Sequence, residues 1–323
     1  MHPAALPPML LEAAPVAVRG RIETFYGTVA AIFEVWVARR QSPHTQRAYR
    51  EDVMAFASLL KIAWPQEAAR LLTASIGDVQ AFREQLHGRN AAPKTINRRI
   101  SSLSSFYKYL AAAAAELRLP ITVPNPAHAQ FISRESTDAR DETRALSATR
   151  ARQLMALPAG ESLIDYRDRA ILKLYLYSGI RLSTGCRLKV SDFHQDGDQA
   201  TIRLHEKGDR RRTIGLHFQA AQAIEEYIER AGITAGALFR PRLNARSRKL
   251  AARGMDPSTM YLIIQRYLER VPGALKQEFL PDGSTGTRSI YTPHSLRATT
   301  ATLLLDAGVD IRKVQDLLGH KHI

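Results

Sequence analysis

Arginine and histidine recur in three short motifs in the second half of the chain. Arg181 follows a glycine that ends an apolar run, His294 and Arg297 stand three residues apart, and His320 follows a second such glycine. Residues three apart lie on one face of a helical turn, so His294 and Arg297 can act on the same group. Lys207 stands between these motifs, in a charged turn that joins two β-prone runs.

These side chains together could carry out phosphoryl transfer without a metal ion. Two guanidinium groups can grip the non-bridging oxygens of a phosphate and stabilise the charge of the transition state. Histidines can share in proton transfer, and a lysine on a turn can protonate a leaving alkoxide. The sequence has no HExxH motif, no GxxxxGK[ST] motif and no carboxylates at ligand spacing, so we expect no metal and no other cofactor.

Taken in order, the motifs resemble those of the tyrosine recombinase (phage integrase) family. The matching segments are Tyr177 to Ser183, the Lys207-Gly208 hairpin, His294-Ser295-Leu296-Arg297 and Leu318-Gly319-His320. Their order and spacing match from Ser147 to the last residue. The segment from Ser42 to Arg50 also resembles the start of that family's amino-terminal core-binding domain. The resemblance thus covers nearly the whole chain except the first twenty residues.

The resemblance implies a role for each matching residue. Arg181 and Arg297 would clamp the scissile phosphate of double-stranded DNA, and Lys207 would act as general acid toward the 5′ oxygen. His294 and His320 would assist in proton transfer and phosphate binding. Family members break and rejoin DNA through a 3′-phosphotyrosyl link, which stores the bond energy without ATP or metal. They act as homotetramers on two paired sites.

Two departures from the family pattern stand out. An acidic residue usually follows the Arg-x-Ser step, where this sequence has Thr184, so a supporting contact to the site is expected to be missing. The nucleophilic tyrosine is expected about nine residues beyond the Gly-His motif, which places it beyond Ile323, and we expect residues 1–323 alone to be inactive. No tyrosine follows Tyr291, for which we predict a core or DNA-facing role.

The spacing of apolar residues predicts a helical bundle in the first half of the chain. Apolar residues at spacings of three and four predict helices over residues 22–36, 43–60, 76–86 and 93–110. Ser42-Pro43 is typical of a helix start, with serine as the cap and proline at the first position. Four short amphipathic helices of this kind can pack as a small bundle.

The second half is predicted to be mixed. A buried helix should end at Ser178-Gly179, after which runs 200–204 and 212–216 predict a hairpin. Further helices are expected at about 220–231, 258–270, 295–307 and 310–318. The predicted fold class is therefore mainly α with a small β component. The resemblance implies that the helical bundle is a core-binding domain and that the mixed α/β half is the catalytic domain.

Composition shifts along the chain suggest the domain boundaries. Residues 1–20, rich in proline and alanine, predict a loosely ordered arm. Residues 21–119 are predicted to form a helical domain, which the resemblance implies is the SAM-like DNA-binding domain of the family. Residues 120–146, with three prolines and no apolar period, predict a linker. Residues 147–323 form the catalytic domain, expected to be incomplete at its carboxyl end.

The charge of the chain favours a polyanionic partner. It carries 46 Lys and Arg against 31 Asp and Glu, a net charge of +15, and clustered cations suggest a surface that grips a duplex, although most charged helix faces are simply solvated. The predicted DNA contacts lie on the second and fourth helices, the hairpin and a basic stretch, and are Thr45, Arg47, Arg50, Lys94, Asn97, Arg98, Arg210, Arg211, Arg246 and Arg248. With one cysteine, no apolar run of about 18 residues and no signal sequence, we expect a cytoplasmic protein without membrane contact.

Two other functions remain open at this point. One is a catalytically silent DNA-binding homologue that keeps the arginine clamp but does not cleave. The other is a type IB topoisomerase, which uses the same chemistry without defined sites. Covalent trapping of DNA separates the first alternative from a recombinase, and relaxation of any supercoiled plasmid would indicate the second.

Overall fold

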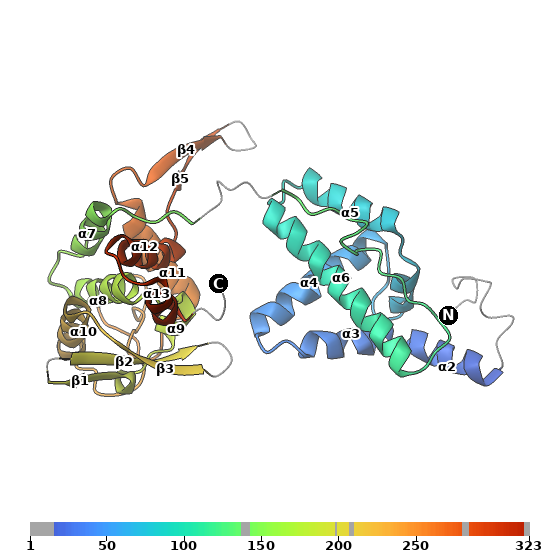
Figure 1. Ribbon diagram of the computed structural model, residues 1–323, viewed down its shortest axis with the longest axis horizontal. Coiled ribbons are helices and arrows are strands. Elements are labelled where there is room, and N and C mark those ends of the chain that lie inside the picture. The colour runs from blue at the N-terminus through green and yellow to red at the C-terminus, as the bar shows by residue number, and fades with distance from the viewer. Residues whose placement is uncertain (1–15, 137–142, 198, 207–209, 280–283, 320–323) are drawn as a thin grey trace. The chain divides into compact units, whose positions relative to one another are not determined.

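The chain folds into two compact, mainly helical units, of which the second also carries two small sheets (Figure 1). The computed structural model describes residues 16–136, 143–197, 199–206, 210–279 and 284–319. The units divide between Asp141 and Glu142. The predicted fold class, mainly α with a small β component, is confirmed.

The first unit is a bundle of amphipathic helices around an aromatic core. Phe33, Trp36, Phe56, Phe82 and Phe106 are all almost completely buried in it. The predicted helix starts at Pro43 and Pro93 are confirmed, with proline in the first turn of each helix. The elements are α2 (Val16–Gly27), α3 (Val29–Ala38), α4 (Pro43–Leu59), the 3₁₀ helix η2 (Ala68–Thr73), α5 (Ile76–Gly88) and α6 (Pro93–Glu116).

The start of this unit differs from the predicted arm and single first helix. α2 begins at Val16, so residues 16–20 are helical, and the helix is interrupted at Thr28 before α3. The two resulting helices, α2 and α3, bury their apolar faces in different places. Ile22 and Phe25 of α2 pack with Ala114 at the end of α6, whereas α3 packs into the main core.

The chain after α6 returns along the bundle and packs on it. Ala127 and Ile132 are buried in the main core. The Asn97 side chain donates to the carbonyl of Glu135 at 3.0 Å and accepts from its amide at 2.8 Å. The first part of the predicted linker, residues 120–136, is therefore attached to the first unit. Its isolated apolar residues have no period, which is why their burial could not be predicted.

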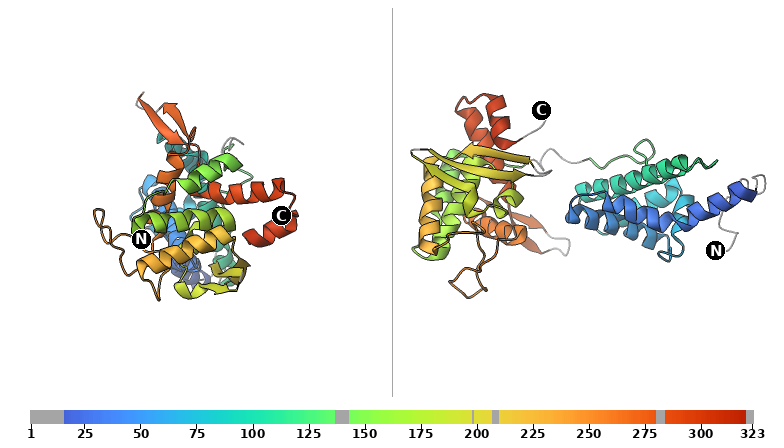
Figure 2. Two further views of the ribbon diagram at one scale, coloured as in Figure 1. Left: turned by 90° about the vertical axis from the view of Figure 1, so that its left-hand side faces the viewer. Right: turned by 90° about the horizontal axis from the view of Figure 1, so that it is seen from below.

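The second unit is built around α8 (Leu163–Ser178), which lies between α10 and α12 (Figure 2). Most residues of α8 are buried, so its sequence is apolar on several sides. Ser147 caps α7, because its hydroxyl accepts from the amide of Arg150 at 3.3 Å. The other helices are α7 (Ala148–Ala156), α9 (Leu182–Cys186), α10 (Phe218–Ala231), α11 (Pro257–Glu269), α12 (Pro293–Asp306) and α13 (Ile311–Leu318).

A three-stranded antiparallel sheet runs in the order β1-β2-β3. Its strands are β1 (Phe193–Asp196), which follows the 3₁₀ helix η4 (Val190–Asp192), β2 (Gln199–Glu206) and β3 (Arg210–Gly215). The pairing of Leu204 with Arg212 and of Glu206 with Arg210 confirms the predicted hairpin. A second hairpin, β4 (Leu275–Phe279) with β5 (Thr285–Ser289), was not predicted from the sequence. In the described residues, no helix combines the length and hydropathy needed to span a membrane.

Candidate active site and nucleic-acid interface

The ends of α8 and α13 meet beside α12, and a glycine permits the contact. Gly179 ends α8 in the left-handed conformation with φ of 59°. A Cβ at this position would lie 2.5 Å from Cδ2 of Leu318 and 3.2 Å from Cβ of Thr300. The Thr300 hydroxyl in turn donates to the carbonyl of Leu176 at 2.7 Å. α8 is thus held at one point against α12 and α13, which lie more than a hundred residues further along the chain.

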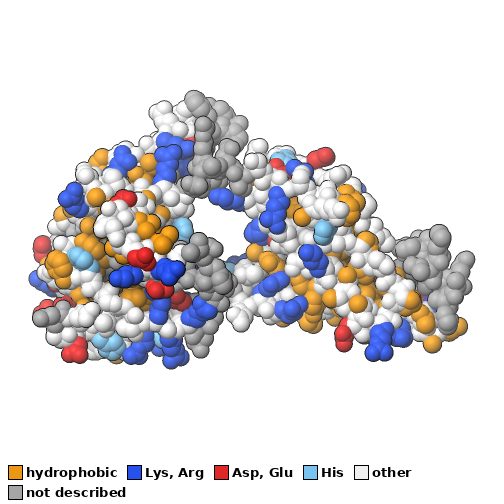
Figure 3. All heavy atoms as spheres, in the orientation of Figure 1, with side chains coloured by type: hydrophobic (Ala, Val, Ile, Leu, Met, Phe, Trp, Pro, Cys, Tyr) orange, Lys and Arg blue, Asp and Glu red, His pale blue; other side chains and the backbone are white. Residues whose placement is uncertain are grey.

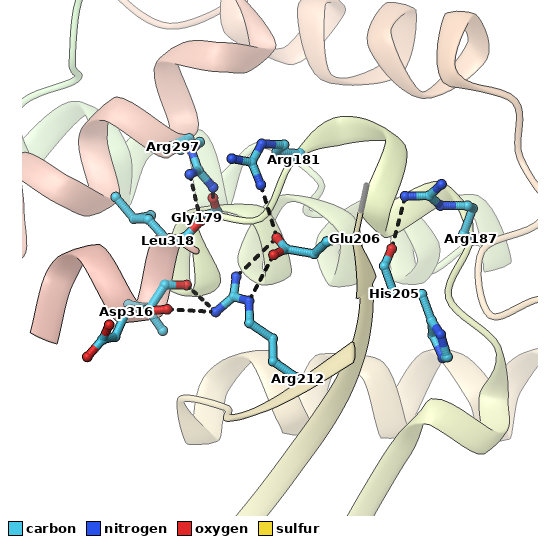
Figure 4. A network of polar contacts seen from close by, with 10 residues as sticks. Gly179, Arg181, Arg187, His205, Glu206, Arg212, Arg297, Asp316 and Leu318 are labelled. Atoms are coloured by element: carbon cyan, nitrogen blue, oxygen red, sulfur yellow. Dashed lines mark hydrogen bonds and ion pairs between the residues drawn. The ribbon is translucent and has the colours of Figure 1, made fainter. Parts of the chain in front are cut away.

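Arg297 on α12 joins the two helix ends through its guanidinium group. Its Nη1 donates to the carbonyl of Gly179 and its Nη2 to the carbonyl of Leu318, both at 2.6 Å (Figure 4). Helix ends leave such carbonyls without intrahelical partners, and a buried cation satisfies them. Burial, with the nearby charge of Arg181, lowers the pKa of Arg297 to about 10. Arg297 therefore remains charged at neutral pH.

Arg181 stands at the start of α9, next to a buried carboxylate. Its Nη1 lies 3.2 Å from Oε1 of Glu206, and its side chain is 43% exposed. Glu206 ends β2 and is shared with Arg212 of β3, whose Nε and Nη2 lie 3.2 and 3.3 Å from the two carboxylate oxygens. Figure 4 shows these three side chains converging from α9 and the hairpin.

Arg212 also reaches the end of α13. Its Nη1 donates to the carbonyl of Leu317 at 2.7 Å and to that of Asp316 at 3.0 Å. Gly319, which directly follows the last residue of α13, has a φ of 67°, and a Cβ there would lie 2.7 Å from Oε2 of Glu206. The hairpin and the carboxyl end of α13 are therefore in direct contact.

His294 lies in the first turn of α12, which is held by a capping box. The amide of Thr292 donates to the Ser295 hydroxyl at 3.0 Å, and together they form a capping box. Burial and the charges of Arg297 and Arg181 lower the pKa of His294. Its imidazole is therefore predominantly neutral at pH 7, and it can accept a proton or donate a hydrogen bond.

Arg181, His294 and Arg297 lie in one cluster, because Arg297 binds the carbonyl of Gly179, two residues before Arg181, and His294 lies one turn before Arg297 on α12. The charges of both arginines lower the pKa of His294. Lys207 and His320, which the sequence assigned to the same site, lie outside the described residues. Tyr291 is buried in the core, where its hydroxyl accepts from Nη1 of Arg150 at 2.8 Å. Of the two predicted roles, core or DNA-facing, this placement agrees with the core role.

The acidic contact that the family pattern places at position 184 is supplied here by a residue of another element. Thr184 is buried, but the carboxylate that contacts Arg181 belongs to Glu206 on β2. Sequence reasoning missed Glu206 and Arg212. The alternation of inward and outward residues along β2 could have indicated Glu206. Its side chain falls on the same inward face as Ala200, Ile202 and Leu204.

The predicted DNA contacts of the first unit have different surroundings. Arg50 forms a bidentate ion pair with Glu34 at 2.5 and 2.6 Å, Arg98 pairs with the buried Asp52, and Asn97 holds Glu135. These three are thus engaged within the chain. Arg47 and Lys94 are exposed, and Thr45 is half-buried. Lys and Arg side chains are spread over the face that carries α6, with few acidic side chains among them (Figure 3).

The predicted contacts of the second unit lie on the hairpin and on an exposed loop. Arg210 and Arg211 are consecutive on β3, so they point to opposite faces, and Arg210 shares the face of Glu206. Arg246 and Arg248 are exposed in a loop whose turn is set by Asn244, because its Oδ1 accepts from the amides of Arg246 and Ser247 at 3.1 and 2.8 Å. Within the described ranges, no three His, Cys, Asp or Glu side chains gather as metal ligands would.

Comparison with known proteins identifies the family. The model of the phage integrase family matches residues 144–323, and that of the phage integrase N-terminal SAM-like domain matches residues 33–114. A tyrosine recombinase XerC of Pelobacter propionicus is 31% identical over 286 residues, covering 87% of this chain and 82% of the relative. A tyrosine recombinase XerC of Anoxybacillus flavithermus is 29% identical over 295 residues, covering 89% and 86%.

Solved structures share the fold at lower identity. A lambda integrase (75–356) dimer bound to a COC′ core site matches with a TM-score of 0.62 at 17% identity, covering 93% of this chain and 95% of that one. A XerH site-specific recombinase bound to a difH substrate matches with a TM-score of 0.63 at 16% identity, covering 99% and 85%. Since the phage integrase model alone matches more than half of the sequence, the chain belongs to the phage integrase family of tyrosine recombinases.

Proposed function

We propose that this protein is a site-specific DNA recombinase that breaks and rejoins DNA through a 3′-phosphotyrosyl intermediate, without metal or ATP. The observation that carries the proposal is the cluster of Arg181, His294 and Arg297 at the junction of α8, α12 and α13. Two guanidinium groups and a neutral imidazole at one point suit the crowded negative charge of a phosphoryl transition state. The relatives named tyrosine recombinase XerC support the same reaction.

Arg181 and Arg297 have distinct parts in this proposal. Arg181 is partly exposed and presents its guanidinium group to the incoming phosphate. Arg297 is buried with both Nη atoms on backbone carbonyls, so it contributes fixed positive charge at low reorganisation cost. His294 then stabilises the phosphate oxygens by donating a hydrogen bond or taking up a proton. Lys207 is the proposed general acid toward the 5′ oxygen, and His320 the second histidine.

The nucleophile in this proposal is a tyrosine, which the family resemblance places about nine residues after the Gly-His motif. Attack of its phenolate oxygen on the scissile phosphorus forms the phosphotyrosyl bond and releases the 5′ oxygen, which takes its proton from Lys207. The reverse attack by a 5′ hydroxyl reseals the strand. The count of bonds to phosphorus is conserved, so no external energy source is required.

The duplex is proposed to contact both units. In the first unit the contacts are Thr45, Arg47, Arg50, Lys94, Asn97 and Arg98, and in the second they are Arg210, Arg211, Arg246 and Arg248. Arg50, Asn97 and Arg98 would have to leave or share their partners within the chain, so their share of the affinity should be smaller than that of Arg47. We further propose a homotetramer on paired sites, as in the lambda integrase tetramer bound to a Holliday junction, and a cytoplasmic location.

Covalent trapping of DNA tests this proposal. Binding sites are first selected from a pool of random duplexes with the 323-residue chain, and nicked substrates are built from the enriched sequences. The protein translated from the entire reading frame is then incubated with them in EDTA and run on a denaturing gel. A covalent protein–DNA band in EDTA is expected, and a requirement for a divalent cation would contradict the proposal.

The same assay separates the two alternatives. A silent DNA-binding homologue would enrich sites from the pool but give no covalent band with any nicked substrate. A type IB topoisomerase would relax supercoiled plasmids whether or not they carry an enriched site. The similarity to XerC over most of the chain favours the recombinase over both.

A further inference from the structure

A charged residue occupies a core position beside the candidate site. The inner face of β2 carries Ala200, Ile202 and Leu204, all nearly fully buried, and then Glu206, which is 8% exposed. A carboxylate at such a position is strongly unfavourable unless it is paired. The two arginines beside it, Arg181 and Arg212, supply three contacts between 3.2 and 3.3 Å.

One partner of Glu206 carries the contact on to α13. Arg212 uses Nε and Nη2 for the carboxylate and Nη1 for the carbonyls of Leu317 and Asp316. A cation at a helix carboxyl terminus satisfies orphan carbonyls and opposes the helix dipole. Glu206 therefore fixes the guanidinium group that caps α13. The absent Cβ of Gly319 leaves room for this approach.

The other partner of Glu206 is the proposed phosphate ligand. A long, partly exposed arginine side chain samples many rotamers unless something holds it. The single described ion pair of Arg181, between its Nη1 and Oε1 of Glu206, restricts that freedom. The carboxylate also offsets repulsion within the cluster, since the charges of Arg181 and Arg212 disfavour the protonated form of Arg297 whereas that of Glu206 favours it.

We infer that Glu206 is a positioning residue that orients Arg181 toward the scissile phosphate and, through Arg212, fixes the end of α13. Glu206 itself touches neither substrate nor reacting atoms. The inference rests on the proposed function, because the orientation of Arg181 matters for activity only if Arg181 binds phosphate. One acidic side chain thereby ties together α9, the β2–β3 hairpin and α13.

Hydrogen exchange tests the link to α13 in the 323-residue chain. The variants are Glu206→Ala, Arg212→Ala and the double variant, with Glu229→Gln on α10 as a control that removes one negative charge elsewhere. Each single variant should speed exchange of the amides of residues 314–319 by about tenfold, and the double variant no further, because both remove the same contact. Exchange in α8 should stay as in the wild type. Unchanged exchange in α13, or effects that multiply in the double variant, would overturn the link.

Cleavage kinetics test the effect on Arg181. In the protein translated from the entire reading frame, Glu206→Ala should lower the single-turnover rate of covalent complex formation at least tenfold at saturating protein. Its duplex affinity should stay within threefold of the wild type, because removal of an anion does not weaken the phosphate grip. Glu206→Asp, which keeps the charge, should recover part of the rate. A rate equal to that of the wild type would overturn the positioning role, as would equal losses of rate and affinity.

The two proposals fail in different ways. If the wild-type protein forms no covalent complex, the proposed recombinase activity fails, and with it the meaning of Glu206 for Arg181. If the wild type cleaves and Glu206→Ala cleaves equally fast, only the positioning role fails.

Discussion

Single residues of the proposed phosphate site are already held in position without substrate. Arg297 is almost entirely buried, and the two backbone carbonyls that it satisfies belong to helix ends far apart in the sequence, Gly179 and Leu318. Its charge is therefore held in place by the fold. Arg181 is held less firmly than Arg297, because it is partly exposed and has one described carboxylate contact. The candidate site thus combines one buried, fixed cation with one that is partly exposed to solvent.

His294 should titrate below its ordinary pKa of 6.5, because burial and the charges of Arg297 and Arg181 disfavour the imidazolium. The unfolded chain then binds more protons than the folded chain between the folded pKa and 6.5. Stability should consequently fall as the pH drops through that window, and His294→Asn should flatten this part of the profile. Proton NMR of the imidazole measures the midpoint. Bound duplex should raise it, and a midpoint above 6.5 in the free protein would contradict the described electrostatics.

The sequence indicated candidate residues for the site, but it did not indicate their contacts. Arg181, His294 and Arg297 were predicted from motifs because each lies next to a local signal, a glycine stop or a helix cap. Glu206 and Arg212 were not, because their roles depend on partners in α9 and α13 that only the tertiary fold brings near. A carboxylate among the inward-facing apolar residues of a strand is unusual, but the sequence of the strand does not show which residue pairs with it.

Among the elements, those with long amphipathic periods were predicted and those with short polar sequences were not. α5 and α6 begin at the predicted residues, since Ile76 and Pro93 open clear periods of 3.6. β1, with the sequence FHQD, and β4, with LKQEF, offer no alternation between apolar and polar residues. The break at Thr28 was missed because the apolar spacing continues across it while the buried surfaces change.

The junction of α8, α12 and α13 should depend on glycine at position 179. Gly179→Ala combines a left-handed backbone with a close approach to Leu318 and Thr300. We expect it to lower the free energy of unfolding of the second unit by about 2–4 kcal/mol, about 1 from the backbone and the rest from overpacking. Urea dependence of hydrogen exchange in α8 measures this.

Gly232→Ala is the matched control for this substitution. Gly232 ends α10 with the same φ of 59°, but a Cβ added there would have no other atom within 4 Å. It should cost only the backbone component, about 1 kcal/mol. Equal losses for the two variants would show that packing at Gly179 has no role in joining the helices.

On the scale of the whole molecule, the surplus of 15 positive charges is distributed over both units. In the first unit several arginines are paired, as Arg98 is with Asp52, so the charge count overstates the number of available phosphate contacts. In the second, Arg246 and Arg248 extend from an exposed loop. The predicted grip on DNA therefore rests on fewer cations than the composition suggests.

Duplex affinity should still fall steeply with salt. If at least four phosphates are neutralised, the logarithm of the affinity should fall with a slope of about −3.6 or steeper, or about 100-fold between 50 and 200 mM salt. Fluorescence anisotropy with a labelled duplex measures the slope. Arg246→Ala with Arg248→Ala should reduce it by about 2 units, one for each lost contact. A slope near zero in the wild type would be incompatible with a phosphate-based grip.

The central claim is that Arg181 belongs to the phosphate site of a metal-free strand-cleaving enzyme. The most direct measurement is the rate of covalent complex formation in EDTA for Arg181→Ala and Arg187→Ala, in the protein translated from its entire reading frame. Arg187 follows α9, which Arg181 precedes, is exposed, and donates to the carbonyl of His205 at 2.9 Å. Loss of Arg181 should slow the reaction about 100-fold or more, as for removal of one transition-state donor, whereas Arg187→Ala should leave it within threefold. Equal rates for the two variants would contradict the assignment of the site.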